Sequence, residues 1–451
     1  MKRVKVKATS VAFSDLEYRT PLKFGTGVVD TVTDAVIMVE VETPQGHRAT
    51  GKGEILLGDL WAFRSTHLDH LARDAAMRVL TFRASRWLEQ TGEEDHPLGI
   101  GMALKEAGIR IAADITREFY LGEPIPPLAA LVCVSPLDAA VHDAFGKAYG
   151  IDTYDGYAPE MCCDLSRWLG EDFRGRYLND FISPEYRTPI PIWHLVGGLD
   201  KLRRGEKRDD DPDDELPVSL DEWIARDGVF CFKVKLRGND PDWDLDRTKE
   251  VFEVARKSLL KKGIDALYLS VDMNEQCESP EYCVEFLEKL RGDPNAGRDA
   301  FDSLLFLEQP VERNLRNRAF DMQPVARIKP VLADEGIVHL EDVDVAFKLG
   351  WSGVALKTCK GHTGTLLTAA KTAAAGKIYT VQDLTNPGLA LIHSVGMAAR
   401  LSPLKGVEAN ARQFIPQAND TIGDPAFQAG LVNIRDGYAR WPKQGAVGLG
   451  Y

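Results

Sequence analysis

The segment Val229-Phe-Cys-Phe-Lys-Val-Lys235 decides the fold of this chain, because it belongs to a series of similar segments. Each is a short β-rich run, and a helical stretch follows most of them. The eight runs cover residues 190–194, 229–235, 266–272, 304–308, 331–334, 353–357, 378–382 and 406–408. Strands that alternate with helices predict a parallel sheet, and eight of them predict a closed α/β barrel of the (β/α)8 type.

Charged side chains stand at the ends of five consecutive runs, from the second to the sixth. In chain order they are Lys233, Lys235, Asp272, Glu308, Asp334 and Lys357. The carboxyl ends of barrel strands meet at one face, and barrel enzymes carry their active sites there. A single acidic residue at a strand end is usually a helix cap or a surface residue, but five consecutive charged strand ends indicate a functional site.

The residue types in this set suit one kind of chemistry. Three carboxylates a few ångströms apart repel one another unless a cation lies between them. Asp272, Glu308 and Asp334 therefore make sense together as ligands of a hard divalent ion such as Mg²⁺, which takes oxygen ligands. A partly desolvated lysine near other cations can act as a general base. Lysines and a metal ion together can stabilise the charge that forms when the proton next to a carboxylate is removed.

The residues before the barrel predict a second domain. Residues 1–57 have the pattern of strands, and residues 68–120 have the three-and-four spacing of apolar residues that is typical of helices. We therefore expect an α+β domain over residues 1–127.

The barrel itself is expected over residues 128–420, and it carries two unusual segments. A helix with a start signal at Ser135 and a glycine near its end, at residue 146, leads into it. Residues 152–189 are irregular, and residues 199–217 contain an acidic run typical of a solvated loop. Both are interpreted as insertions that either reshape the mouth of the barrel or serve an oligomer interface.

Composition excludes some classes of partner. The chain has 451 residues and a formal net charge of −13, which disfavours nucleic acid and anionic membrane surfaces. Seven cysteines without a C-x-x-C pair fit reduced thiols. The first residues alternate basic and apolar side chains, as a strand does, and no apolar run is long enough to span a bilayer. We therefore expect a cytoplasmic protein whose partner is a small molecule.

The chain resembles the enolase superfamily, and within it the muconate lactonizing enzyme-like subgroup of the mandelate racemase/muconate lactonizing enzyme family. The resemblance covers nearly the whole chain. Its motifs are the charged strand ends, Thr20–Gly27 (similar to a mobile loop that closes over substrate), Gly51-x-Gly-Glu54, Leu137–Lys147 and Val447–Tyr451. It implies a (β/α)7β barrel capped by an α+β domain built from both chain ends, with residues 421–451 completing the cap.

The resemblance also implies roles for the strand-end residues. Lys235 and Lys357 are implied as the two acid/base groups, and Lys233 as the residue that orients a substrate carboxylate. Mg²⁺, with Mn²⁺ as a possible substitute, is implied on Asp272, Glu308 and Asp334. Asn274 and Glu335 are implied to lie behind these ligands, although Glu335 is also an alternative third ligand. A homo-oligomer is expected.

Other residues define expected substrate contacts and departures from the subgroup. The expected contacts are Thr20, Phe24, His194, Gln382, Asp383, Asn386, Glu408 and Asn410, with a packed role equally open for His194. The seventh run ends without the histidine of mandelate racemase-like enzymes. The eighth has Glu408-Ala-Asn410 where dipeptide epimerases carry Asp-x-Asp. Lys360 is expected to stay outside the site, because a register shift would be needed to bring it in.

Three reactions remain open on this site. A racemase or epimerase would use both lysines in turn, and a cycloisomerase or a syn β-elimination dehydratase would use one as acid/base and the other to stabilise charge. The complete charged set argues against a non-enzymatic scaffold. A zinc hydrolase is disfavoured because no H-x-H pair ends a strand.

Overall fold

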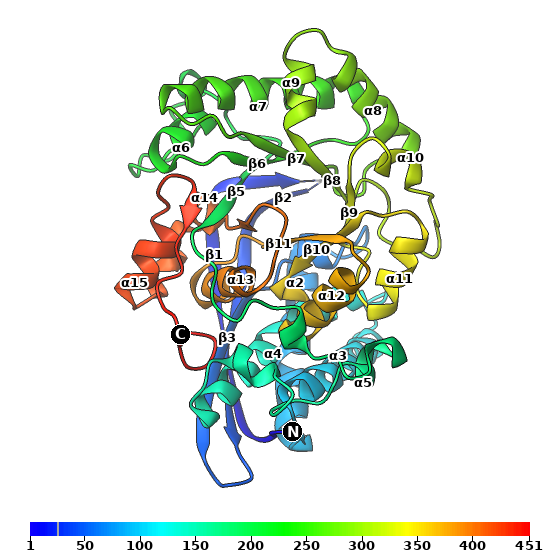
Figure 1. Cartoon of the computed structure of the whole chain (residues 1–451), viewed down its shortest axis with the longest axis vertical. Helices are drawn as coiled ribbons and strands as arrows, with labels where there is room; N and C mark the ends of the chain where they lie inside the picture. The colour runs from blue at the N-terminus through cyan, green and yellow to red at the C-terminus, as the bar shows by residue number, and fades with distance from the viewer. Residues whose placement is uncertain (25–26) are drawn as a thin grey trace.

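The computed structural model describes residues 1–24 and 27–451, without the side chain of Phe24 (Figure 1). The N-terminal part forms an antiparallel sheet of order β3-β2-β1-β4. Its strands are β1 (Val4–Phe24), β2 (Gly27–Glu42), β3 (Arg48–Leu56) and β4 (Glu94–Asp95). Its helices are α1 (Asp59–Ala62), α2 (His70–Thr91) and α3 (Pro97–Glu118). The predicted order of strands followed by helices is confirmed.

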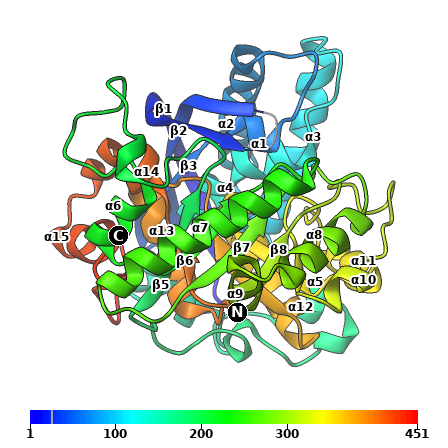
Figure 2. The ribbon, with the colours of Figure 1, turned by 90° about the horizontal axis from the view of Figure 1, so that it is seen from above.

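Eight parallel strands form a closed barrel beside this sheet (Figure 2). They are β5 (Ile190–Val196), β6 (Cys231–Lys235), β7 (Tyr268–Asp272), β8 (Leu304–Glu308), β9 (Val331–Ala333), β10 (Gly353–Lys357), β11 (Ile378–Gln382) and β12 (Val407–Glu408). The ring closes because β12 pairs with β5 in parallel. All eight predicted runs are strands, and the predicted barrel is confirmed.

Each of the first seven barrel strands is followed by at least one helix, which is the (β/α)7β arrangement. The helices are α6 (Leu220–Asp227), α7 (Pro241–Lys261), α8 (Pro280–Gly292), α9 (Ala296–Ser303), α10 (Gln323–Ala326), α11 (Leu340–Lys348), α12 (His362–Ala374) and α13 (Gly388–Arg400). Only short elements follow the last strand in the described part of the chain, namely α14 (Ala411–Phe414), η6 (Pro416–Thr421), α15 (Pro425–Phe427), η7 (Gln428–Val432) and β13 (Tyr438–Ala439).

The helix that leads into the barrel, α4 (Pro127–Tyr149), begins eight residues before the predicted start. Ser135 is therefore not an N-cap but lies in mid-helix beside Pro136, which has no N–H to donate to the carbonyl oxygen of Val132. The Ser135 hydroxyl donates to that oxygen at 2.8 Å instead. This bond lets the helix continue through the proline, and it explains why a start signal stands inside a helix.

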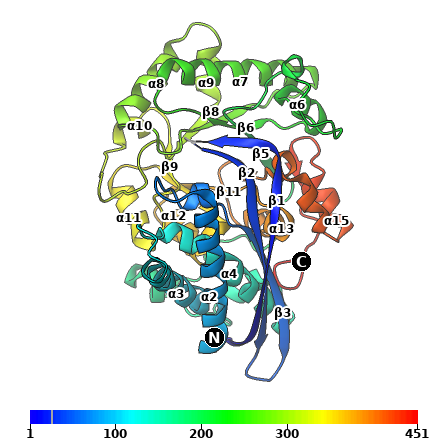
Figure 3. The same ribbon diagram turned by 180° about the vertical axis from the view of Figure 1, so that it is seen from behind.

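Helix α4 is central to the molecule and links the two parts (Figure 3). Among the described residues it is the one helix long and apolar enough to cross a membrane, and that apolar stretch is entirely buried in the protein. It packs against β3, where Gly51 and Gly53 let two backbones approach. A Cβ atom on Gly53 would lie 2.0 Å from the carbonyl oxygen of Pro136. The G-x-G motif therefore exists because side chains there would separate the sheet from α4.

The two unusual segments lie at different places. In the first of them, residues 183–187 pack at the far end of α13 from the mouth, where Ser183 and Arg187 donate backbone hydrogen bonds to the carbonyl oxygens of Arg400 and Ala399. Helices of a barrel run opposite to its strands, so this end lies away from the mouth. Residues 183–187 consequently do not reach the mouth, whereas Tyr157 of the same segment is hydrogen-bonded to His362 at the start of α12. Residues 199–217 do lie beside it.

We predict that Gly53→Ala destabilises the protein by about 3 kcal/mol, because the new methyl group overlaps the backbone of α4. Urea unfolding followed by circular dichroism measures this change. Gly205→Ala is the matched control, since a methyl group on this exposed residue would have no atom within 4 Å. Equal stability of the two variants would contradict this account of the motif.

Candidate active site

The pairing of the barrel strands decides which side chains point into the mouth. Lys233 aligns with Leu195 on β5, and Lys235 aligns with Asp272 on β7. Asp272 in turn aligns with Glu308 on β8. Because successive residues of a strand face opposite sides, this register turns all five side chains inward.

Lys233 lies deepest in the resulting network of charges. Its Nζ atom is 2.8 Å from Glu308 Oε1, 3.2 Å from Asp272 Oδ2 and 3.2 Å from Glu408 Oε2. Lys235 donates to Asp272 Oδ2 at 2.5 Å and to Asn274 Oδ1 at 2.9 Å. The sequence predicted these residues at one face, and the structure brings them into direct contact.

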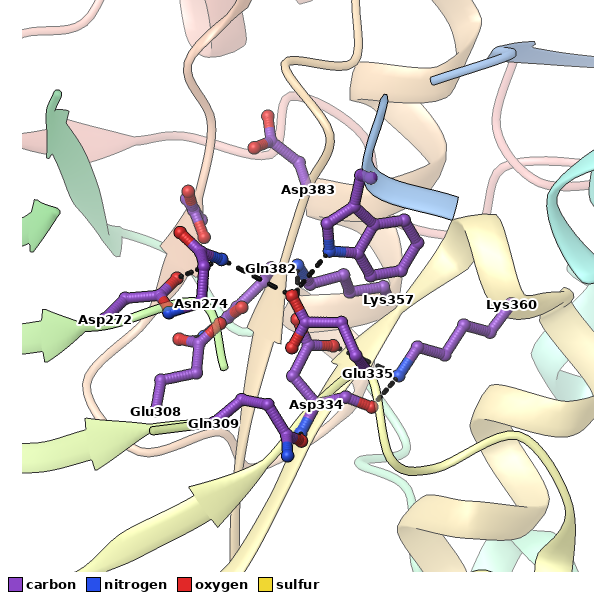
Figure 4. Close-up of polar contacts among 12 residues, drawn as sticks. Asp272, Asn274, Glu308, Gln309, Asp334, Glu335, Lys357, Lys360, Gln382 and Asp383 are labelled. Carbon is purple, nitrogen blue, oxygen red and sulfur yellow. Dashed lines mark hydrogen bonds and ion pairs between the residues drawn. The ribbon is translucent and has the colours of Figure 1, made fainter. Parts of the chain in front are cut away.

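The other half of the network surrounds Asp334 (Figure 4). Lys357 Nζ lies 2.8 Å from Asp334 Oδ2, and Lys360 Nζ lies 3.1 Å from Oδ1. The expectation that Lys360 stays outside the site is wrong. The 3₁₀ turn Thr358–Lys360 follows β10 directly and brings the third residue after Lys357 back to the same carboxylate.

Residues behind the charged set hold it in place. The Asn274 backbone N–H donates to Asp272 Oδ1 at 2.9 Å, and Asn274 adopts a left-handed φ of 43°, which asparagine tolerates well. Glu335 Oε1 accepts from the Trp61 indole N–H at 2.9 Å. Gln309 Oε1 accepts from the backbone N–H of Asp334 at 2.8 Å. Neither Trp61 nor Gln309 was predicted, because contacts between distant segments leave no pattern in sequence.

Burial and ion pairing shift the pKa values in opposite directions. Burial raises the pKa of the Glu308 carboxyl to about 8, against the opposing attraction of Lys233. Burial acts to lower the pKa of Lys357. The negative charge of Asp334 outweighs burial and holds this pKa well above its usual value. Burial raises the pKa of Asp383 to about 7, and the nearby charge of Glu408 adds to the effect.

The residues present fit a divalent cation by their charge and donor type. Six buried carboxyl groups face four buried lysines, so acidic side chains outnumber basic ones; the acids are Asp272, Glu308, Asp334, Glu335, Asp383 and Glu408, and the bases are Lys233, Lys235, Lys357 and Lys360. All the acidic donors are hard oxygens, as Mg²⁺ prefers. As the side chains lie, no three His, Cys, Asp or Glu residues in the described chain converge as a metal site. Lys233 stands between Asp272 and Glu308 instead.

A pocket lies between the charged strand ends and the N-terminal sheet. Its floor is formed by Lys233, Lys235, Lys357, Asp383 and Glu408. The N-terminal part covers it with apolar side chains and with Trp61, whose ring centroid is 4.7 Å from Lys357 Nζ. Reactive groups on the floor are thus covered from solvent.

Several predicted substrate contacts are placed elsewhere. His194 aligns with the outward-facing Phe232 and is hydrogen-bonded to Arg412 and Gln413 outside the barrel, so Leu195 lines the pocket in its place. Thr20 lies in a neighbouring cavity, and Tyr18 takes its position at the pocket. Leu195 is one residue from His194, as strand alternation requires, and Tyr18 is two residues from Thr20, within the register irregularity between Glu17 and Leu22. Phe24 falls outside the described side chains.

The remaining predicted contacts divide into lining and supporting residues. Asp383 and Glu408 line the pocket. Gln382 donates to Glu308 Oε2 at 2.5 Å, and Asn410 donates to Glu408 Oε1 at 2.8 Å, so both support the floor. Asn386 is fully buried, and its amide has no hydrogen-bond partner among the residues that the structure describes.

The hairpin of β1 and β2 bends over the mouth and is tied to the segment 199–217 (Figure 3). Arg19 donates to both carboxylate oxygens of Asp214 at 2.5 and 2.6 Å, and to the carbonyl oxygens of Leu216 and Pro217. The acidic segment was predicted as a solvated loop, but Asp214 within it fixes the hairpin that carries Tyr18 into the pocket.

Solved structures resemble this chain along its full length. A dipeptide epimerase from Enterococcus faecalis V583, complexed with Mg and L-Leu-L-Tyr, is 16% identical with a TM-score of 0.62, covering 99% of each chain. A muconate lactonizing enzyme from Pseudomonas fluorescens is 18% identical with a TM-score of 0.62, covering 99% of this chain and 95% of that one. This chain has the fold of the enolase superfamily. The resemblance predicted from the motifs is confirmed at the level of the fold.

A third structure with the enolase-superfamily fold extends the likeness to another subgroup. An enolase from Bradyrhizobium, complexed with magnesium and mandelic acid, is 19% identical with a TM-score of 0.57, covering 100% of this chain and 96% of that one. No protein-family model matches the sequence, and no curated protein sequence matches it either.

We predict that Arg19→Ala increases hydrogen–deuterium exchange of the hairpin around Tyr18 by at least about tenfold, because a bidentate ion pair and two carbonyl contacts are lost. Mass spectrometry of peptic peptides measures this exchange. Arg48→Ala is the control, since Arg48 is an exposed arginine at the other end of the sheet, paired with Glu42. Unchanged exchange in Arg19→Ala would show that the segment 199–217 does not hold the hairpin.

Proposed function

We propose that this protein is a magnesium-dependent racemase or epimerase that removes the proton next to a carboxylate group and returns a proton on the opposite face. The observation that carries the proposal is that Lys235 and Lys357 line one pocket from opposite sides. Strands β6 and β10 stand four places apart in a closed ring of eight. A substrate carbon bound between them presents one face to each amine.

In this proposal each lysine acts on one face of the substrate. The lysine facing the proton accepts it in its neutral form, and the opposite lysine donates from its ammonium form. Lys233 lies between the carboxylates at the floor and contributes positive charge toward the carboxylate of the substrate. The cover of Trp61 and the apolar residues of the N-terminal part excludes water, which strengthens these interactions.

Asp272, Glu308 and Asp334 would hold the metal ion. When bound, Mg²⁺ supplies positive charge that stabilises the charge developing on the substrate carboxylate oxygens. The excess of buried carboxyl groups over buried lysines supports this assignment. So do the structural neighbours solved with magnesium, whose ligands include a dipeptide and mandelic acid, both carboxylates.

A cycloisomerase or a syn β-elimination dehydratase would use the same groups. Both need only one lysine as an acid/base, whereas the second would stabilise charge. The placement of two lysines on opposite sides of the pocket favours the two-base reaction.

Exchange of the α-proton in D₂O tests the proposal. With Mg²⁺ and pooled carboxylic acids (hydroxy acids, N-acyl amino acids, dipeptides and diacids), we expect loss of an α-proton signal in the proton NMR spectrum. Lys235→Ala and Lys357→Ala should each lower the rate at which the stereoisomers interconvert by at least about 10²-fold. Each should still exchange the stereoisomer whose proton faces the remaining lysine.

Lys289→Ala is the control for these variants, because Lys289 is a half-exposed lysine on α8 that pairs with Glu285. Exchange with loss of water or with ring closure would assign the dehydratase or the cycloisomerase instead. Exchange that survives removal of both lysines would refute the proposal.

Metal binding gives a separate prediction. Asp334→Asn should weaken Mg²⁺ binding by at least about tenfold, because a charged oxygen ligand is replaced by a neutral one. Titration calorimetry with MgCl₂ measures the affinity. Asp344→Asn, at a half-exposed residue paired with Lys371, is the control. If Asp334→Asn binds Mg²⁺ as tightly as the natural protein, the assignment of this ligand is wrong.

A further inference from the structure

The wall of the pocket opposite the floor is apolar. The N-terminal part contributes Leu22, Val29, Val32, Leu56, Leu60 and Trp61 to it. The barrel adds Leu195 and Leu384 from the ends of β5 and β11. A ligand bound on the floor therefore meets a continuous hydrocarbon surface on its other side.

Positive charge in the pocket is confined to the floor. Of the described residues that line it, the cationic ones are Lys233, Lys235 and Lys357, which stand at strand ends among the carboxylates. The proposed reaction uses all three on the first carboxylate and on the α-carbon. A second carboxylate on the substrate would have no cationic partner there.

The other polar groups that line the pocket are neutral or acidic. Tyr18 and Thr385 are hydrogen-bonded to each other through their hydroxyl groups at 2.6 Å. The carboxylate of Asp59 is turned toward the Arg73 guanidinium, which donates to it at 2.9 Å. Asp383 makes no ion pair with a lysine or an arginine in the described chain and accepts from the backbone N–H of Asn410 at 3.0 Å. None of these groups supplies a positive charge to an anion.

We infer that the substrate is a monocarboxylate with an apolar substituent that packs against this wall, and that the site rejects dicarboxylates. The inference rests on the proposed function, because it takes the lysine floor as the place of the reacting carboxylate. Burying hydrocarbon against the wall tightens binding about fourfold for each methylene group. Burying a second carboxylate without a partner opposes binding strongly.

Val29 lies where a change of side chain should alter the preference for monocarboxylates over dicarboxylates. It lies on β2 and lines the pocket, whereas its neighbour Val28 points away and is 50% exposed. Val29→Arg places a cation within the apolar wall, and Val28→Arg places the same charge on the outer surface. The two variants differ only in the face of the strand that carries the arginine.

Binding of non-reacting acids tests the inference without relying on catalysis. Calorimetry in the presence of Mg²⁺ should show hexanoate binding about fifteenfold more tightly than butanoate, and adipate at least tenfold more weakly than hexanoate. Val29→Arg should reverse the preference between hexanoate and adipate, while Val28→Arg should leave it unchanged. Thermal melts confirm that both variants are folded.

Each outcome decides one of the two proposals. Adipate binding as tightly as hexanoate, an affinity that does not depend on chain length, or no binding of any acid would overturn the inferred substrate class. Selective binding of hexanoate without α-proton exchange of any apolar acid would refute the proposed reaction and leave the apolar monocarboxylate site standing.

Discussion

The ion pairs between Lys233 and the carboxylates of Asp272, Glu308 and Glu408 lie in the interior of the barrel, where an unpaired charge would cost several kcal/mol. Four lysines and six acids share this space. Removal of Lys233 would leave three carboxyl groups without their shared ammonium partner. The network thereby constrains the register of β6 to β8 and the turns after β9 and β10. The excess of carboxyl groups over lysines is also what makes a divalent cation fit the site.

The N-terminal part completes the site by covering it. Trp61 links the two parts, since its indole N–H binds Glu335 while its ring lies against Lys357. The hairpin of β1 and β2 supplies Tyr18 and much of the apolar wall. It is held over the mouth by Arg19 and the segment 199–217, which is one of the features that the sequence marked as unusual for this fold. In the proposed function, the barrel supplies the reacting groups and the N-terminal part supplies most of the apolar wall against which the substrate would pack.

The fold could be predicted almost completely because its signals are local and repeat. Three of the eight predicted strands, 304–308, 353–357 and 378–382, have the observed bounds. The start of α4 was predicted wrongly because Ser135 imitates a cap while it satisfies a carbonyl inside the helix. Lys360 was placed wrongly because a 3₁₀ turn, which brings residues three apart together, follows β10 where an extended strand was assumed.

The sequence by itself determined the barrel and the charged residues at its strand ends. The reason is that the alternation of strands with helices, and the residue types at the end of each strand, are local features of the sequence. Only the tertiary structure decided which neighbour faces inward, as with Leu195 and His194, and which distant residues meet, as with Trp61 and Glu335 or Arg19 and Asp214. Those contacts join segments up to hundreds of residues apart. The packing of the N-terminal part on the barrel decides which residues meet in these contacts. A local sequence pattern contains no information about that packing.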